Sequence, residues 1–88
     1  MTQLATLREG IDEIDAQLVA LLARRFALTD EVGQYKKQHQ LPATDAAREA
    51  AQMARISELA QQHGLDPALA QKFLRVVIDE VVTRHKLL

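Results

Sequence analysis

The sequence predicts an all-α protein in which one long N-terminal helix is followed by two shorter helices. Apolar residues recur at alternating steps of three and four from Leu4 to Tyr35, which is the spacing of a helix that packs against another helix. Ala, Leu and Val dominate the hydrophobic residues, a composition typical of helices rather than of strands. Two stretches, at Pro42 and at Gly64–Pro67, carry residues that end helices. They divide the chain into three segments.

The first helix is expected over residues 3–37. Its apolar face forms a heptad seam that consists of Leu4, Leu7, Ile11, Ile14, Leu18, Leu21, Arg25, Leu28, Val32 and Tyr35. No proline interrupts this stretch before Pro42. A helix of this length extends roughly 50 Å, more than one small globule can bury. The seam therefore predicts a second long helix as its partner.

The second and third helices are expected over residues 45–63 and 67–86. Thr44 or Asp45 can cap the second helix, whose apolar face is thin and rich in alanine. Gly64 suits the position just after its end. Asp66 and Pro67 then provide an N-cap and a first-turn proline for the third helix, whose broad apolar surface predicts burial on more than one side.

Composition excludes several classes of function. The net charge is −1 with interspersed signs, so the chain has no basic stripe for nucleic acid. It has no cysteine, and its three histidines lie too far apart in sequence for a local metal motif. No apolar stretch is long enough to span a membrane. With Met1 as the natural start, these features predict a soluble cytoplasmic protein with a single helical domain over residues 1–88.

Arg25 is the one cation within the apolar seam. A charged residue at such a position is explained either by a bound ligand or by a structural role. Lys36 lies on the same helix face, roughly 16 Å further along. Arg8 lies about 25 Å away in the other direction and is turned by about 100°. It can therefore share a site with Arg25 only if it comes from a second, antiparallel chain.

The start of the second helix brings further charged residues towards Lys36. Asp45 and Arg48 can face the same way because they are three residues apart, and Glu49 follows directly. The loop before them continues from Lys36, so Arg48 can return to its vicinity. Several cations without an acidic partner for each indicate a small anionic ligand in a largely apolar pocket.

Each of these residues also has a purely structural interpretation. Arg8 can be a solvated helix residue, Arg25 can snorkel or set the register of paired helices, and Lys36 can be a favourable C-terminal charge. His85 continues an apolar stripe in the last turn of the third helix, where the helix dipole favours it.

As an ordered set, the motifs resemble the all-helical class of chorismate mutases over essentially the whole chain. The resemblance lies in Leu-Arg8-Glu-x-Ile-Asp-x-Ile-Asp15, Leu-Leu-Ala-Arg-Arg25, Glu31-Val-Gly33-x-x-Lys36, Pro42-x-x-Asp45-x-x-Arg48-Glu49 and the apolar helix after Gly64-Leu-Asp66. It implies an intertwined homodimer of three-helix chains with two shared active sites.

The resemblance also implies an activity: the pericyclic rearrangement of chorismate to prephenate, which needs no metal, cofactor or nucleophile. Such an enzyme holds the substrate in its compact reactive conformation and stabilises the charge that grows on the ether oxygen. By match to the family pattern, Arg25 and Arg8 of the partner subunit bind the substrate carboxylates. Lys36 donates to the ether oxygen and a carboxylate.

The match places Asp45 and Arg48 near the substrate ring, and Glu49 accepts a hydrogen bond from the ring hydroxyl.

Two positions depart from the pattern of the best-known members. Val81 replaces a serine, which removes a polar contact, and His85 replaces the glutamine that donates to the ether oxygen.

His85 can still donate a hydrogen bond, either as one neutral tautomer or more strongly as imidazolium. This predicts that kcat/KM rises as the pH falls through the titration of His85, and that the profile changes in His85→Gln. In the competing interpretation the register slips near the end of the chain, and His85 only caps the helix.

Two alternative functions remain open at this stage. The first is an isochorismate-pyruvate lyase on the same scaffold, which uses a similar set of cations, and the sequence does not decide between chorismate, isochorismate and amino-chorismate as substrate. The second is a non-catalytic helical dimerisation module in which the cations are solvated or set the register.

Overall fold

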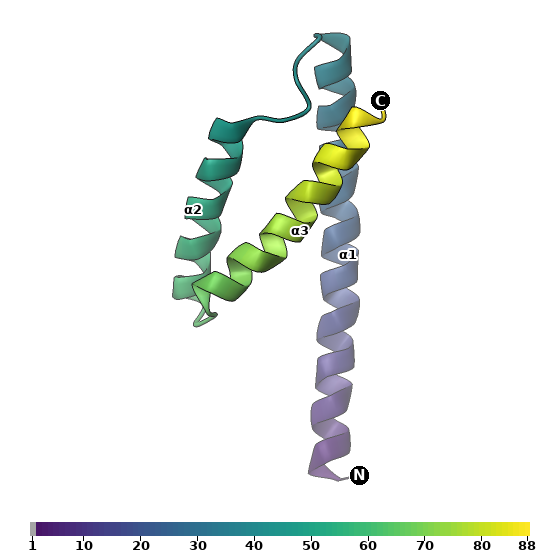
Figure 1. The fold of residues 1–88 in the computed structure, drawn as a ribbon. Helices are drawn as coiled ribbons and strands as arrows, with labels where there is room; N and C mark the ends of the chain where they lie inside the picture. The colour runs from purple at the N-terminus through teal and green to yellow at the C-terminus, as the bar shows by residue number, and fades with distance from the viewer. Residues whose placement is uncertain (1) are drawn as a thin grey trace.

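The computed structural model describes residues 2–88 as three helices joined by two short connections (Figure 1). α1 spans Gln3–Gln38, α2 spans Ala46–Gln62 and α3 spans Pro67–Lys86. Residues 2–88 contain no strand, so the fold is all-α with three helices, as the sequence predicted. The molecule measures 56 × 24 × 16 Å because α1 is one continuous helix of 36 residues.

The helices begin at residues whose side chains satisfy free backbone N–H groups. Thr2, Asp45 and Asp66 precede α1, α2 and α3, and each accepts a hydrogen bond from a first-turn N–H at 3.1, 3.0 and 3.0 Å. Asp45 is therefore the cap of α2, which starts one residue later than expected. Gly64, with a φ of 71°, follows the end of α2 in the left-handed region that favours glycine.

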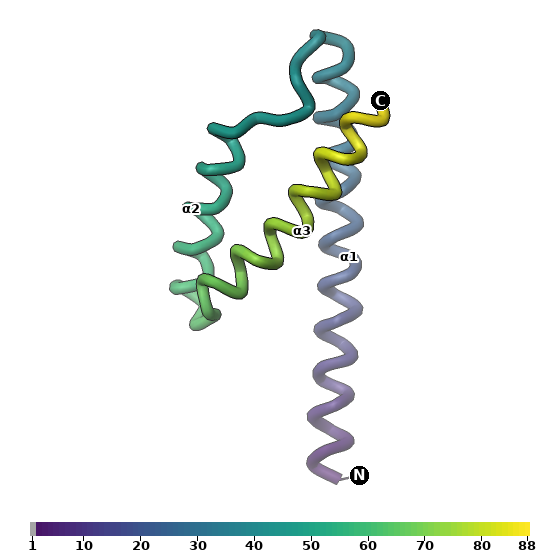
Figure 2. The backbone as a smooth tube through the Cα atoms, in the orientation of Figure 1, coloured from purple at the N-terminus to yellow at the C-terminus, as the bar shows by residue number. Residues whose placement is uncertain are grey.

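α3 is the central helix of the fold. It packs against α2 and crosses the C-terminal half of α1 (Figure 2). Four of the buried apolar residues belong to α3 and one to α2: Ala70, Leu74, Val77 and Ile78 with Ala60. α3 thus contacts both other helices, but Leu69, Phe73 and Val76 of its apolar surface are 44% to 70% exposed, so the predicted burial on more than one side is only partly seen in the single chain.

The N-terminal half of α1 extends away from the other two helices (Figure 1). Its seam residues are between 44% and 63% exposed: Leu4, Leu7, Ile11, Ile14, Leu18 and Leu21. A continuous apolar stripe of this kind marks an interaction surface on a soluble protein. Within residues 2–88, no helix combines the length and the apolar character that crossing a membrane demands.

Gly33 is the buried residue of α1 at the crossing with α3. A Cβ atom at this position would lie 2.6 Å from Cδ2 of His85 and 2.8 Å from Cδ1 of Leu88. A glycine inside a helix costs about 1 kcal/mol relative to alanine. This cost is offset here because the missing side chain lets the end of α3 approach the α1 backbone.

We expect Gly33→Ala to lower the free energy of unfolding by about 1–3 kcal/mol, because the added methyl group overpacks the helix crossing. Gly10→Ala in the same helix is the matched control, since nothing lies within 4 Å of a Cβ there. It is expected to raise stability by about 0.5–1 kcal/mol. Chemical denaturation measures both, and equal stability of the two variants would contradict the packing argument.

Candidate functional site

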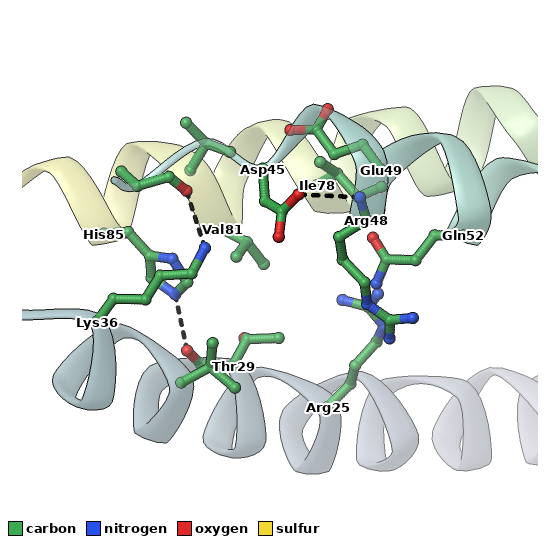
Figure 3. A pocket seen from close by; sticks show the side chains of 13 residues that line it. Arg25, Thr29, Lys36, Asp45, Arg48, Glu49, Gln52, Ile78, Val81 and His85 are labelled. Atoms are coloured by element: carbon green, nitrogen blue, oxygen red, sulfur yellow. Dashed lines mark hydrogen bonds between the residues drawn. The ribbon is translucent and has the colours of Figure 1, made fainter. Parts of the chain in front are cut away.

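A cavity of about 140 Å³ lies between the C-terminal half of α1, the start of α2 and the last turns of α3 (Figure 3). It is lined by every site residue predicted from the sequence except Arg8, namely Arg25, Lys36, Asp45, Arg48, Glu49, Val81 and His85. Much of the remaining lining is aliphatic and comes from Val32, Ile78 and Val82. The cavity therefore combines cationic groups with apolar walls.

α1 contributes two cations to this cavity. Lys36 donates from Nζ to the backbone carbonyl of Ala43 at 3.2 Å, which holds its side chain across the connection between α1 and α2. Arg25 has a buried nitrogen, Nη1, that finds no hydrogen-bonding partner within residues 2–88. A buried N–H without an acceptor is costly. A carboxylate ligand would satisfy it, with the fork of the guanidinium suited to bidentate contact.

The first turn of α2 supplies the opposite wall. Asp45 caps the helix by accepting from the backbone N–H of Arg48 at 3.0 Å, so its Oδ1 is used in forming the element that carries the site. Both residues line the cavity, as their spacing predicted. The Arg48 side chain extends from α2 towards the region reached by Arg25 from α1 (Figure 3). Two guanidinium groups on one cavity favour an anionic ligand.

Glu49 is tied to α3 by a residue that the sequence analysis did not single out. Arg75 donates from Nη2 to Oε1 of Glu49 at 2.9 Å and also pairs with Asp79 at 2.8 Å. Hydrogen bonds to Glu49 and then to Asp79 raise the pKa of the Arg75 guanidinium above its usual value. Arg75 thereby ties the first turn of α2 to α3 beside the cavity.

His85 is buried in the wall formed by α3, with an exposed fraction of 9%. Its Nε2 lies 2.7 Å from the backbone carbonyl oxygen of Thr29 in α1. Its Nδ1 is buried and finds no hydrogen-bonding partner within residues 2–88. The residue that caps the end of α3 is Leu87. Val81, one turn before His85, is half-buried and presents only methyl groups to the cavity.

Thr29 was missed by the sequence analysis because its contribution is a main-chain carbonyl, which no side-chain pattern reveals. Arg8 is the predicted residue that the single chain does not bring to the cavity. It lies on the exposed N-terminal half of α1, about 25 Å along the helix from Arg25.

Comparison with known proteins defines the class to which this helical fold and site belong. The family model described as chorismate mutase type II matches residues 7–86. The chain therefore belongs to the chorismate mutase type II family.

The relatives differ in the share of their own length that this chain covers. The chorismate mutase of Methanocaldococcus jannaschii is 34% identical over 77 residues, which cover 88% of this chain and 78% of that protein. The 4-amino-4-deoxychorismate mutase of Streptomyces pristinaespiralis is 35% identical over 80 residues, covering 91% and 59%. The T-protein of Enterobacter agglomerans is 37% identical over 83 residues, but the chain spans only 22% of its length.

We expect Arg25→Met to stabilise the free protein by about 1 kcal/mol, because it removes a buried N–H without an acceptor and keeps the aliphatic packing. The same variant is expected to lose the rise in Tm that a dicarboxylate ligand gives the wild type. Arg24→Met, at the exposed neighbouring position, is the control and changes neither quantity appreciably. A less stable Arg25→Met would show that the guanidinium has a structural partner.

Proposed function

We propose that the chain converts chorismate to prephenate in a homodimer with two shared active sites. The observation that supports this best is that Arg25, Lys36 and Arg48 line one largely apolar cavity in a chain of the chorismate mutase type II family. Chorismate has two carboxylates and an ether oxygen within a small molecule. The cation set therefore matches its charges, and the aliphatic walls match its ring and side chain.

The proposed mechanism needs positioning and electrostatic stabilisation only. Arg25 and Arg8 of the partner subunit hold the two carboxylates, so the substrate stays in the compact conformation in which its reacting carbons meet. Lys36 donates to the ether oxygen, where negative charge grows as the C–O bond breaks. Substrate bound against the aliphatic walls would displace water from them, which would strengthen this interaction in the transition state.

The homodimer accounts for two features of the single chain. The exposed apolar stripe on the N-terminal half of α1 needs a cover, and a second α1 in antiparallel orientation has the same length and the same stripe. That arrangement brings Arg8 of the partner subunit alongside the later turns of α1. The cavity then receives a further cation.

A second candidate substrate is 4-amino-4-deoxychorismate, on which a relative named for that activity acts. Glu49, which lines the cavity and pairs with Arg75, is compatible with this substrate. The Glu49 carboxylate can accept a hydrogen bond from the ring hydroxyl of chorismate or pair with the ring ammonium group of the amino analogue. Comparing kcat/KM for chorismate, 4-amino-4-deoxychorismate and isochorismate, with product identification, decides among a mutase of either kind and a lyase.

We expect Lys36→Ala to lower kcat by roughly 10²- to 10³-fold, the range for loss of one donor to a developing oxyanion. Its effect on stability is expected to be small, because the Lys36 hydrogen bond to the Ala43 carbonyl is only part-buried. The control is Lys37→Ala, which removes an exposed cation from the next position. Chorismate loss followed by absorbance measures both variants, and unchanged turnover in Lys36→Ala would assign Lys36 a structural role.

Shared sites make a separate prediction for mixed dimers. Arg8→Ala and Lys36→Ala are each expected to be nearly inactive, whereas an equimolar mixture after refolding recovers about a quarter of wild-type turnover. Half of the dimers are then mixed, and each mixed dimer has one site in which both residues are intact. Activity of the mixture that equals the mean of the two variants would contradict the shared-site arrangement.

A further inference from the structure

The His85 ring is held in orientation along the edge that carries Nε2 and Cδ2. Nε2 lies 2.7 Å from the Thr29 carbonyl oxygen, which can only accept a hydrogen bond. The adjacent Cδ2 rests against Gly33, where a Cβ would come within 2.6 Å. Nε2 therefore carries the hydrogen, and the ring cannot turn over without losing this bond.

This orientation determines what His85 offers to the cavity that it lines. Nδ1 lies across the ring from Cδ2, so it faces away from Gly33, and it is buried without a partner within residues 2–88. In the neutral ring, Nδ1 has a lone pair and can only accept. Nδ1 becomes a donor only in the imidazolium, because the single N–H of the neutral ring already donates to the Thr29 carbonyl.

Charged groups of both signs surround His85. The charged residues that share its two cavities are Arg25, Asp30, Lys36, Asp45, Arg48, Glu49 and Arg84. Arg84 pairs with Asp30 at 3.4 Å and with Glu80 at 3.3 Å, so its charge is engaged by two carboxylates. The main cavity carries three cations, Arg25, Lys36 and Arg48, against two carboxylates, Asp45 and Glu49.

A dianionic ligand adds two negative charges to this cavity. Its two negative charges favour the imidazolium, and an oxygen near Nδ1 needs a donor rather than a lone pair. We infer that binding of the dicarboxylate substrate is coupled to uptake of a proton at Nδ1 of His85, and that Gly33 is the positioning residue that makes this possible. The inference rests on the proposed function only for the identity of the ligand.

Calorimetric titration with a bicyclic dicarboxylate that mimics the chair-like transition state tests the coupling. Run near pH 7.5 in buffers with different ionisation enthalpies, it measures the protons taken up per site. The wild type is expected to take up a large fraction of one proton, and its affinity rises as the pH falls, because protonation favours the bound state. In His85→Gln, the uptake is expected to fall to near zero.

Two glycine variants distinguish positioning from simple damage. Gly33→Ala is expected to reduce the proton uptake because the ring is displaced from Thr29, whereas Gly10→Ala, with free space around its Cβ, keeps the wild-type value. If Gly33→Ala does not fold, ¹⁵N NMR of the wild-type imidazole provides the second measurement. It is expected to show hydrogen on Nε2 alone in the free protein near pH 8 and on both nitrogens in the complex.

The inference is overturned if the wild type and His85→Gln take up the same number of protons, or if the neutral ring carries its hydrogen on Nδ1. Failure of the proposed function has a different signature. In that case neither chorismate nor its amino analogue is converted and the dicarboxylate does not bind, while the NMR measurement on the free protein still reports the tautomer. Turnover of chorismate with no proton uptake would remove the inference and leave the proposed function in place.

Discussion

The crossing of α3 over α1 at Gly33 is the contact on which the rest of the structure depends. α3 is the helix that packs against both neighbours, and α2 is held in place mainly through it. A Cβ at position 33 would come within 3.0 Å of the His85 and Leu88 side chains, so the end of α3 or these side chains would have to shift. The same close approach buries His85 and sets its hydrogen bond to Thr29. A change at this crossing therefore affects both the packing of the helices and the position of His85 in the cavity wall.

α1 has two halves with different environments. The C-terminal half supplies Arg25 and Lys36 to the cavity and meets α3 at Gly33, whereas the N-terminal half extends beyond the other two helices. The apolar stripe runs through both halves without any break in the helix, and its later members Leu28, Val32 and Tyr35 are also 46% to 63% exposed. A rigid element of this kind keeps a residue such as Arg8 at a defined distance from the cavity of its own chain.

Helix number and approximate extent were predictable from the sequence because caps, glycine and proline act locally. Asp45, Asp66 and Gly64 mark helix ends through contacts with their nearest neighbours in the chain. The grouping of Arg25 with Lys36 was predictable from helical periodicity. Contacts that join distant segments were not, because no local pattern encodes them.

Two such contacts matter for the site. Arg75 reaches Glu49 from another helix, and its sequence position on α3 resembles that of an ordinary surface residue. The bond from His85 to Thr29 ends on a main-chain oxygen. The sequence resemblance predicted that His85 replaces a donor, but only the geometry shows which nitrogen lies against the Thr29 carbonyl.

The topology also has a kinetic consequence. Helices form locally within microseconds, and the contacts between α2 and α3 require only a short connection to close. A chain that has completed these steps still exposes the apolar stripe of α1. In the proposed homodimer, covering that stripe requires an encounter between two chains, whose rate depends on protein concentration. We therefore expect dilution to slow the last stage of assembly while leaving the early helix formation unaffected.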